Sequence, residues 1–321
     1  MRVLFAGSPG IAVPSLQAIA GVAELAGILT NEASRRGRGL STSATPVSLA
    51  AASLPGGGPP VLAYERLGAE AREAVAALAP DLLVSFAYGR IFGPKFLSIF
   101  PLGGINVHPS LLPRWRGPTP IPAAILHRDV ESGVSVQLLA PAGPDGAGID
   151  GGDLLAVERI ALDPRETTAS LSGKAALVGA GLVASVAKSI AEGRAVSRPQ
   201  EGEATYSTLL RKDDGLIDWS RPVKVIDALV RAYDPWPGAY TLLRGQRLAV
   251  LEAVAHPEPG RKFEAGVAPG TILGLDKSLG LMVQGFDGLV ALRSLQLQQK
   301  KALGWRDFAN GVRDLAGTRL G

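Results

Sequence analysis

The stretch NVHPSLLPRWRG, residues 106–117, decides how the first half of the chain is organised. The residues before it, from Ile99 to Ile105, are apolar apart from a Gly-Gly break, and polar side chains then begin abruptly. This pattern predicts a buried strand whose carboxyl end opens at a site. Asn106 and His108 are two positions apart, so on a strand their side chains point to the same face. An amide and an imidazole side by side can stabilise an oxyanion and move a proton.

On either side of this stretch, strand-like and helix-like runs alternate. The predicted strands are residues 1–6, 24–30 and 81–87, and the predicted helices are residues 13–20, 46–52 and 69–78. Strands separated by helices predict an α/β fold with a Rossmann-like, parallel-rich sheet. Ligands of such sheets bind outside the carboxyl ends of the strands. Residues 31–43 are polar and rich in Gly and Arg, which predicts a mobile loop.

The second half of the chain has a different pattern of predicted elements. Residues 168–191 are apolar with helical periodicity, which favours a core helix, and residues 192–204 are polar with Gly and Pro. After a predicted helix at 226–232, closely spaced short strands predict a small β-barrel: 240–243, 247–254, 270–275, 279–284 and 289–297. We therefore expect three parts: a Rossmann-like domain (1–191), a linker (192–207) and a C-terminal barrel domain (208–321).

Composition narrows the function classes. The 321 residues include no cysteine and only three histidines with no close pair, which excludes disulfides and thiolate sites and makes us expect no metal. The chain has no signal-peptide pattern, and we expect no membrane-spanning run, hence a cytoplasmic protein without a membrane partner. Net charge is +4. From Leu209 onward there are 16 Lys and Arg against 12 Asp and Glu, whereas the preceding part is balanced. This excess is compatible with a polyanionic partner such as RNA, or with solubility alone.

Asp150 is the candidate partner of His108. A strand-like run at 133–139 is followed by a Gly- and Pro-rich excursion at 140–148 and then by Asp150 beside two glycines. Glycines allow close backbone approach, so Asp150 could orient the imidazole or position a water. The alternative is a turn-forming Asp, since Asp beside Gly is common in turns. Asp145 is a second candidate for the same role.

Two arginine-rich segments are candidates for ligand contact. Residues 114–117 combine two guanidiniums with an indole, which could hold an anionic or aromatic group or pack at a domain edge. Residues 35–39 place three arginines beside glycines, which suits a loop that touches phosphates or a solvated charged loop. The turn at 7–10 follows the first strand but fits neither dinucleotide nor P-loop fingerprints.

Taken in order, these residues resemble the methionyl-tRNA formyltransferase family over almost the whole chain. The matching motifs are 5–9 (FAGSP), 36–39 (RGRG), 87–89 (AYG), 106–108 (NVH), 110–117 (SLLPRWRG), 120–121 (PI), 133–135 (GVS), 150–153 (DGGD), 217–219 (IDW), 231–232 (RA), 235–237 (PWP) and 269–272 (PGTI). The resemblance implies a Rossmann-like catalytic domain and a C-terminal barrel resembling an OB-fold. It also implies transfer of a formyl group from 10-formyltetrahydrofolate to the α-amine of methionine on initiator methionyl-tRNA, by a monomer and without metal.

The resemblance also implies roles for individual residues. The catalytic residues would be Asn106, His108 and Asp150. Residues that bind the folate co-substrate would be Ser110, Leu111, Leu112, Pro113, Tyr88, Gly89, Arg90 and Ile91. Residues that contact tRNA would be Arg36, Arg38 and Gly39. The chain departs from the family in a longer, Gly- and Pro-rich segment at 140–148 and in Ser41-Thr42-Ser43, which stand where the family has lysines.

Four other functions are alternatives to this interpretation. A formyltransferase for an amino sugar nucleotide would keep the same three catalytic residues, but it would not need the arginine-rich loop or the basic C-terminal part. A purine-pathway formyltransferase would not need the last hundred or so residues. An RNA-binding protein on this scaffold would not need intact catalytic residues. A nicotinamide-dependent dehydrogenase is disfavoured by the missing dinucleotide fingerprint.

Overall fold

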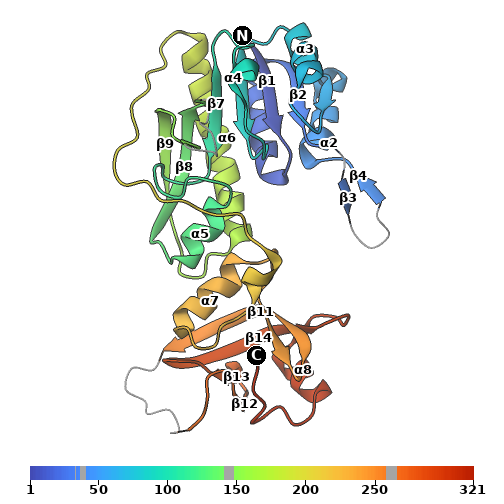
Figure 1. The fold of residues 1–321 in the computed structure, drawn as a ribbon, viewed down its shortest axis with the longest axis vertical. Coiled ribbons are helices and arrows are strands. Elements are labelled where there is room, and N and C mark those ends of the chain that lie inside the picture. The colour runs from blue at the N-terminus through green and yellow to red at the C-terminus, as the bar shows by residue number, and fades with distance from the viewer. Residues whose placement is uncertain (33, 37–40, 141–147, 258–265) are drawn as a thin grey trace. The chain divides into compact units, whose positions relative to one another are not determined.

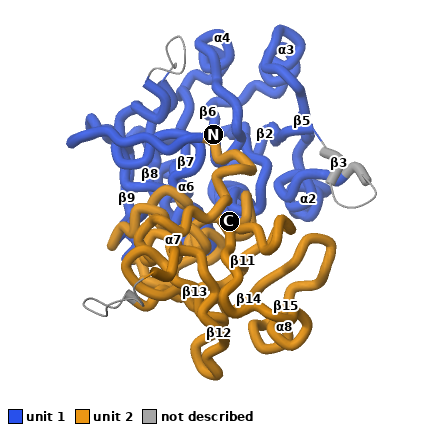
Figure 2. Tube along the Cα trace, turned by 60° about the horizontal axis from the view of Figure 1, so that its bottom comes forward, with its two compact units in different colours: residues 1–120, 131–161, 172–208 blue, residues 121–130, 162–171, 209–321 orange. Residues whose placement is uncertain are grey.

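The computed structural model describes residues 1–32, 34–36, 41–140, 148–257 and 266–321, and its contacts divide them into two compact units. Unit 1 comprises 1–120, 131–161 and 172–208; unit 2 comprises 121–130, 162–171 and 209–321 (Figure 2). A seven-stranded sheet forms the centre of unit 1. Its strands, in spatial order, are β5 (Val61–Ala63), β2 (Glu24–Thr30), β1 (Arg2–Gly7), β6 (Leu82–Phe86), β7 (Gly104–His108), β8 (Glu131–Leu138) and β9 (Leu154–Ala161).

The order of these strands contains a topological switch point. From β1 the chain builds outward through β2 and β5, and it then returns to the other side of β1 to place β6 and β7 (Figure 1). All of these pairs are parallel, which confirms the parallel-rich α/β prediction. The last two strands are antiparallel, β8 to β7 and β9 to β8. A ligand site is expected at the carboxyl ends of β1 and β6, where the order reverses.

Capping residues and prolines help to set where a helix begins. Thr45 caps α2, because its hydroxyl accepts a hydrogen bond from the Ser48 amide at 3.2 Å, and Pro46 occupies the first turn. The bounds are α1 (Val13–Ala20), α2 (Pro46–Ala52), α3 (Ala69–Ala77), α4 (Pro94–Leu97), α5 (Pro120–Leu126) and α6 (Thr168–Ala191), with short 3₁₀ turns η1 (Gly10–Ala12) and η2 (Pro55–Gly57). The predicted helices 46–52 and 168–191 are confirmed residue for residue.

Helix α6 packs closely on the sheet. A Cβ at Gly179 would lie 3.1 Å from Val107 and 3.6 Å from Val134, so only a hydrogen at this position permits the approach. Helix α6 has 24 residues and contains an 18-residue window with a mean hydropathy of 1.4, so it has the length and composition of a membrane span, although the sequence analysis expected no such run. Core helices of soluble proteins meet the same criteria, and 33% of this window is buried, with Val183 fully buried.

The segment predicted as a mobile loop, 31–43, contains a short hairpin. Strands β3 (Ser34–Arg36) and β4 (Ser41–Ser43) pair antiparallel, so the loop prediction is wrong for these residues. This hairpin could not be predicted, because neither strand has the apolar alternation by which strands are recognised. Arg38 and Gly39 lie outside the described residues.

Unit 2 is built on an antiparallel sheet. Its strands follow the order β10 (Tyr240–Leu243), β11 (Gln246–Pro257), β14 (Gly288–Leu297), β13 (Gly280–Gln284) and β12 (Ile272–Asp276), with β15 (Leu303–Gly304) pairing to β14. Near the C-terminus, Leu320 bridges Leu243 at the end of β10, and Arg319 bridges Thr271 just before β12. These bridges join the two edge strands and close a small barrel, as the sequence predicts.

Helix α7 (Val223–Ala232) lies against this barrel, and α8 (Trp305–Gly311) and the 3₁₀ turn η4 (Lys212–Gly215) complete unit 2. Val223, Ile226 and Val230 lie on one face of α7 and are buried in the barrel core. The predicted parts 1–191, 192–207 and 208–321 remain a prediction. The observed units differ from them, since contacts group 121–130 and 162–171 with the C-terminal residues.

Candidate active site

A cavity of 370 Å³ opens at the carboxyl ends of β6 and β7, one strand away from the expected position between β1 and β6. Its lining comes from the ends of β6 and β7, from the turn after β7, and from both sides of the segment between β8 and β9. Among its lining residues are Asn106, His108 and Asp150, which lie far apart in the sequence. The volume is within the range of small-molecule sites. Residues 141–147, which include Asp145, lie outside the described residues.

Strand β7 presents Asn106 and His108 two positions apart, as predicted. Asn106 pairs in register with Ser85 on β6 and Gln137 on β8, whereas His108 is at the carboxyl end of β7 and only 4 % exposed. The Nε2 atom of His108 lies 2.9 Å from the carbonyl oxygen of Trp115. A carbonyl only accepts, so Nε2 carries a proton and donates it. The other ring nitrogen, Nδ1, remains for chemistry.

Asp150 lies opposite that nitrogen. Its Oδ2 atom is 3.6 Å from His108 Nδ1 and accepts a hydrogen bond from the Gly117 amide at 2.9 Å. Its Oδ1 atom accepts from the Gln137 side-chain amide at 3.0 Å. The backbone of Asp150 has a φ of 52°, in the left-handed region where non-glycine residues are uncommon. A strained backbone at a site is often part of how a side chain is aimed.

The turn that carries Asp150 depends on Gly152. A Cβ at Gly152 would lie 1.9 Å from the carbonyl oxygen of Leu138, so no other residue fits without moving the strand. The Leu138 amide in turn donates to the carbonyl oxygen of Asp153 at 2.9 Å. The turn after the excursion is thus fixed to the end of β8, which explains why Asp150 rather than a remote position approaches His108.

The predicted folate-binding residues divide into two groups. Tyr88, Gly89, Arg90 and Ile91 all line the cavity. None of Ser110, Leu111, Leu112 and Pro113 lines it. Ser110 is buried, and its hydroxyl donates to the carbonyl oxygen of Arg114 at 2.6 Å. This hydrogen bond stabilises the conformation of the loop that follows β7.

The segment at 88–91 is tied to the end of β2. The Asn31 side-chain nitrogen donates to the backbone carbonyl oxygen of Tyr88 at 3.0 Å, and Arg90 Nε donates to the side-chain oxygen Oδ1 of Asn31 at 2.9 Å. The Tyr88 ring stacks on Phe92 with centroids 5.4 Å apart. Burial raises the pKa of the Tyr88 phenol above its usual range, with Arg90 acting weakly in the opposite direction. The phenol is therefore neutral at physiological pH.

Sequence reasoning missed two glutamines at this site. Gln137 is 1 % exposed and donates to Asp150, as described above. Gln200, from the segment predicted as a linker, donates from Nε2 to the carbonyl oxygens of Asp150 and Gly152, both at 2.8 Å. The signal for Gln137 was a polar residue inside an apolar strand, and nothing in the sequence pointed to Gln200.

The residues predicted to contact tRNA are only partly described. Arg36 ends β3, where its backbone pairs with Ser41. Over the parts of the chain that the structure describes, no group of three or more His, Asp or Glu side chains is arranged to hold a metal ion.

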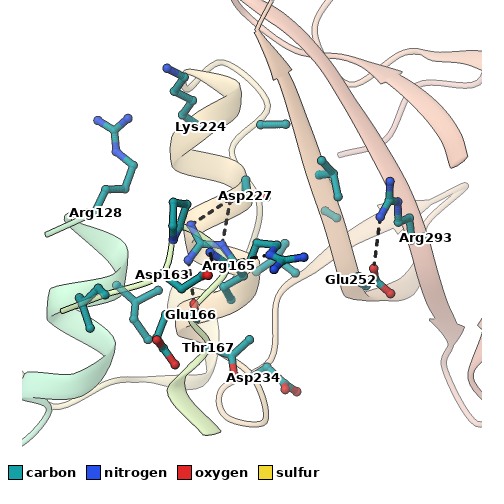
Figure 3. Close-up of a pocket in the computed structure, with 18 of the residues that line it drawn as sticks. Arg128, Asp163, Arg165, Glu166, Thr167, Lys224, Asp227, Asp234, Glu252 and Arg293 are labelled. Carbon is teal, nitrogen blue, oxygen red and sulfur yellow. Dashed lines mark hydrogen bonds and ion pairs between the residues drawn. The ribbon is translucent and has the colours of Figure 1, made fainter. Parts of the chain in front are cut away.

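Unit 2 contains a second, larger cavity of 930 Å³ (Figure 3). No predicted site residue lines it. Its wall mixes charged and apolar side chains, and Arg231 and Asp227 form an ion pair of 2.9 Å across one turn of α7. The same arginine donates to the carbonyl oxygen of Glu166 at 2.8 Å, which connects α7 to the residues before α6.

Comparisons with known proteins agree on one family. The model of the family described as "Formyl transferase" matches residues 11–186, and that described as "Formyl transferase, C-terminal domain" matches residues 209–313. A methionyl-tRNA formyltransferase of Treponema denticola is 42% identical over 320 residues, covering 98% of each chain. One of Roseiflexus sp. is 39% identical over 325 residues, covering 100% of this chain and 95% of the relative.

Solved structures resemble the fold at low sequence identity. The N-formyltransferase of Helicobacter canadensis, in complex with folinic acid and dTDP-3-aminofucose, has a TM-score of 0.64 at 17% identity and covers 94% of this chain and 100% of that one. HypX of Aquifex aeolicus, in complex with tetrahydrofolic acid, has a TM-score of 0.62 at 16% identity and covers 98% of this chain. This chain spans about half of HypX, 48% of its length.

Proposed function

The chain belongs to the methionyl-tRNA formyltransferase family, and on that premise we propose that it transfers the formyl group of 10-formyltetrahydrofolate to the α-amine of methionine on initiator methionyl-tRNA. The observation that carries the proposal at the site is the convergence of Asn106, His108 and Asp150 on one cavity. The family uses formyl-folate as its donor. The product primes translation initiation, so the protein would act in the cytoplasm.

The reaction forms a nitrogen–carbon bond and breaks another. The uncharged α-amine attacks the formyl carbon, and negative charge develops on the formyl oxygen. The Asn106 side-chain amide donates to this oxygen, together with the Nδ1–H of a protonated His108. The 3.6 Å between Nδ1 and Asp150 Oδ2 is longer than a hydrogen bond and leaves this N–H available. Collapse of the intermediate returns the electron pair to N10 of the folate.

Asp150 handles the proton that the amine loses. Its carboxylate is the nearest described base to His108, and it accepts the proton directly or through a water. The proton then passes to N10 of the departing tetrahydrofolate, so the enzyme ends the cycle in its starting state. The Asp150 carboxylate accepts hydrogen bonds from the Gly117 amide and the Gln137 side chain, which hold it in place beside His108.

Two segments would hold the folate. Residues 88–91 line the cavity, where their backbone groups and an apolar side chain would contact a pterin. The apolar side chain is that of Ile91, which is 57 % exposed. We also assign Ser110, Leu111, Leu112 and Pro113 to folate binding, through the shape that they give the loop after β7.

The acceptor would be held by Arg36, Arg38 and Gly39 at the acceptor end of the tRNA, and by the weakly basic part after Leu209 for more of its length. We propose that catalysis lies within 1–191 and tRNA binding within 208–321, joined by 192–207, and that a monomer carries both.

The experiment measures transfer of radiolabelled formyl from 10-formyltetrahydrofolate, with initiator methionyl-tRNA and a dTDP-amino sugar offered in parallel. We expect label on the tRNA and a loss of about 100-fold or more in His108→Ala and in Asn106→Ala, as for removal of an oxyanion donor. Label on the sugar alone would overturn the proposed acceptor. Near-normal turnover of either variant would remove that residue from the mechanism. Arg38→Ala should weaken tRNA use far more than folate binding, and equal loss of both would contradict its assignment.

A further inference from the structure

We propose that Gln137 and Gln200 are positioning residues that aim the carboxylate of Asp150 at His108, with the Arg116 guanidinium fixing the direction of their hydrogen bonds. We use the name amide chain for the four side chains of Arg116, Gln200, Gln137 and Asp150, which contact one another in that order. The inference rests on the proposed function, because it assigns a role to residues that act through Asp150.

The direction of every bond in the amide chain follows from its first member. A guanidinium only donates, and Arg116 donates from Nε and Nη2 to Gln200 Oε1 at 3.1 and 2.7 Å. Gln200 must then turn its Nε2 the other way. The two hydrogens of this nitrogen serve the carbonyl oxygens of Asp150 and Gly152, both at 2.8 Å, and Gln137 Oε1 lies beside it at 3.2 Å. Gln137 in turn has only Nε2 left for Asp150 Oδ1, at 3.0 Å. The cation at one end and the carboxylate at the other leave one arrangement for both amides.

The amide chain also holds the backbone under Asp150. Gln200 Nε2 lies 2.8 Å from the carbonyl oxygen of the left-handed residue Asp150 itself and 2.8 Å from that of Gly152, two residues further on. At a φ of 52° this backbone persists only where its surroundings determine it. Gln200 therefore fixes the position of the Asp150 backbone, and Gln137 fixes the orientation of its carboxylate.

The remaining oxygen of Asp150 is the one that faces His108. With Oδ1 taken by Gln137, Oδ2 is left to the Gly117 amide and to His108 Nδ1. A carboxylate free to rotate would share its oxygens among these donors. A small misplacement of a reacting group can cost a large factor in rate, so this orientation bears on turnover and not only on stability.

The first measurement compares Gln137→Met and Gln200→Met with the wild-type protein in formyl transfer to initiator methionyl-tRNA. Met has nearly the shape of Gln and removes both the donor and the acceptor. We expect kcat to fall about tenfold in Gln137→Met, which loses one hydrogen bond to the charged carboxylate, and by at least as much in Gln200→Met, which loses those with Arg116 and with two carbonyl oxygens. The KM values for tRNA and for 10-formyltetrahydrofolate should stay within about twofold in Gln200→Met, since Gln200 does not line the cavity. Gln137 does line it, so its positioning role is tested by kcat and by its dependence on Asp150.

The matched control is Gln284→Met. Gln284 is also a buried glutamine on a strand, 3 % exposed, and its Nε2 donates to the carbonyl oxygen of Gly285 at 2.8 Å, but it lies in unit 2. We expect its loss to lower the melting temperature and leave kcat unchanged. A fall in kcat for Gln284→Met equal to that of Gln137→Met would overturn the inference, because general destabilisation would then explain both.

The decisive measurement repeats Gln137→Met in an Asp150→Asn background. If Gln137 acts through Asp150, the second substitution adds no further loss of kcat, whereas independent effects would multiply. A full further tenfold loss, an unchanged kcat in both single variants, or an effect confined to KM would each overturn the inference.

The wild-type protein is assayed first on the tRNA and on the dTDP-amino sugar, and the variants are assayed on whichever acceptor takes the label. Transfer to the sugar alone, with the variant pattern kept, would refute the proposed acceptor and support the positioning roles. Transfer to neither would overturn both.

Discussion

Replacing Asp150 by Asn should destabilise the protein and slow it, although the two side chains have almost the same shape. The carboxylate accepts from the Gly117 amide at 2.9 Å and from Gln137 Nε2 at 3.0 Å. An Asn side chain has one acceptor and one donor, so its NH₂ group must face one of these donors. Reversing the Gln137 amide only moves the conflict to Gln200 Nε2, 3.2 Å away. At least one buried hydrogen bond is lost in every arrangement.

The size of the effect follows from that count. One buried donor left without a partner costs about 2 kcal/mol. In a unit of this size that corresponds to a fall in melting temperature of about 4–8 °C. The rate should fall more, by about 100-fold or about 2.7 kcal/mol of barrier, because an amide cannot accept the proton of the amine.

The assay is thermal unfolding beside formyl transfer at saturating substrates, with Glu158→Gln as the control. Glu158 is exposed on β9, and its substitution makes the same change of charge without breaking a described hydrogen bond. We expect Glu158→Gln to match the wild-type protein in both measurements. A variant Asp150→Asn that melts at the wild-type temperature would refute the hydrogen-bond geometry. One that keeps wild-type kcat would refute the proposed proton acceptor.

Three further predictions concern other parts of the structure. Gly152→Ala should abolish folding of the site or lower stability by several kcal/mol, measured by urea unfolding, because its Cβ would lie 1.9 Å from the Leu138 carbonyl. Trp219→Phe should cost about 1–2 kcal/mol in the same assay, since the indole donates to the buried Thr241 hydroxyl at 3.1 Å. For Tyr88, burial raises the pKa of the folded phenol, so the unfolded chain releases its proton first. Stability should therefore fall as pH rises through about 10, and less steeply in Tyr88→Phe.

The fold was predictable wherever local pattern decides structure. Strand β2 at Glu24–Thr30 and helix α2 at Pro46–Ala52 are as predicted. Apolar runs and helix caps involve only a few neighbouring residues, so they can be recognised in the sequence. The antiparallel direction of β8 and β9 was not predicted, since a strand's direction depends on where its connection leads and not on its own residues. The hairpin of β3 and β4 was missed because its strands are polar.

Those parts of the site were predictable whose chemistry can be recognised from the residue type and its local sequence. Asn106 and His108 share a strand face, and period-two alternation is visible in any sequence. Asp150 was predicted from its flanking glycines, with the turn-forming alternative left open. The structure shows that it does both, since it occupies a left-handed turn and approaches the imidazole. Gln200 could not be found this way, because its contacts with Asp150 exist only in the folded chain.

The position of Gln200 in the chain has a consequence for truncated proteins. A fragment that ends at residue 191 keeps all seven strands of the unit 1 sheet and every side chain of the proposed catalytic trio. It lacks Gln200 and also Thr205, whose hydroxyl accepts from the Trp115 amide at 2.9 Å. Such a fragment would have the sheet but a poorly held active site. One that continues to residue 208 would carry both supports, so the catalytic residues lie within 1–191 but the residues that hold them in place continue into 192–207.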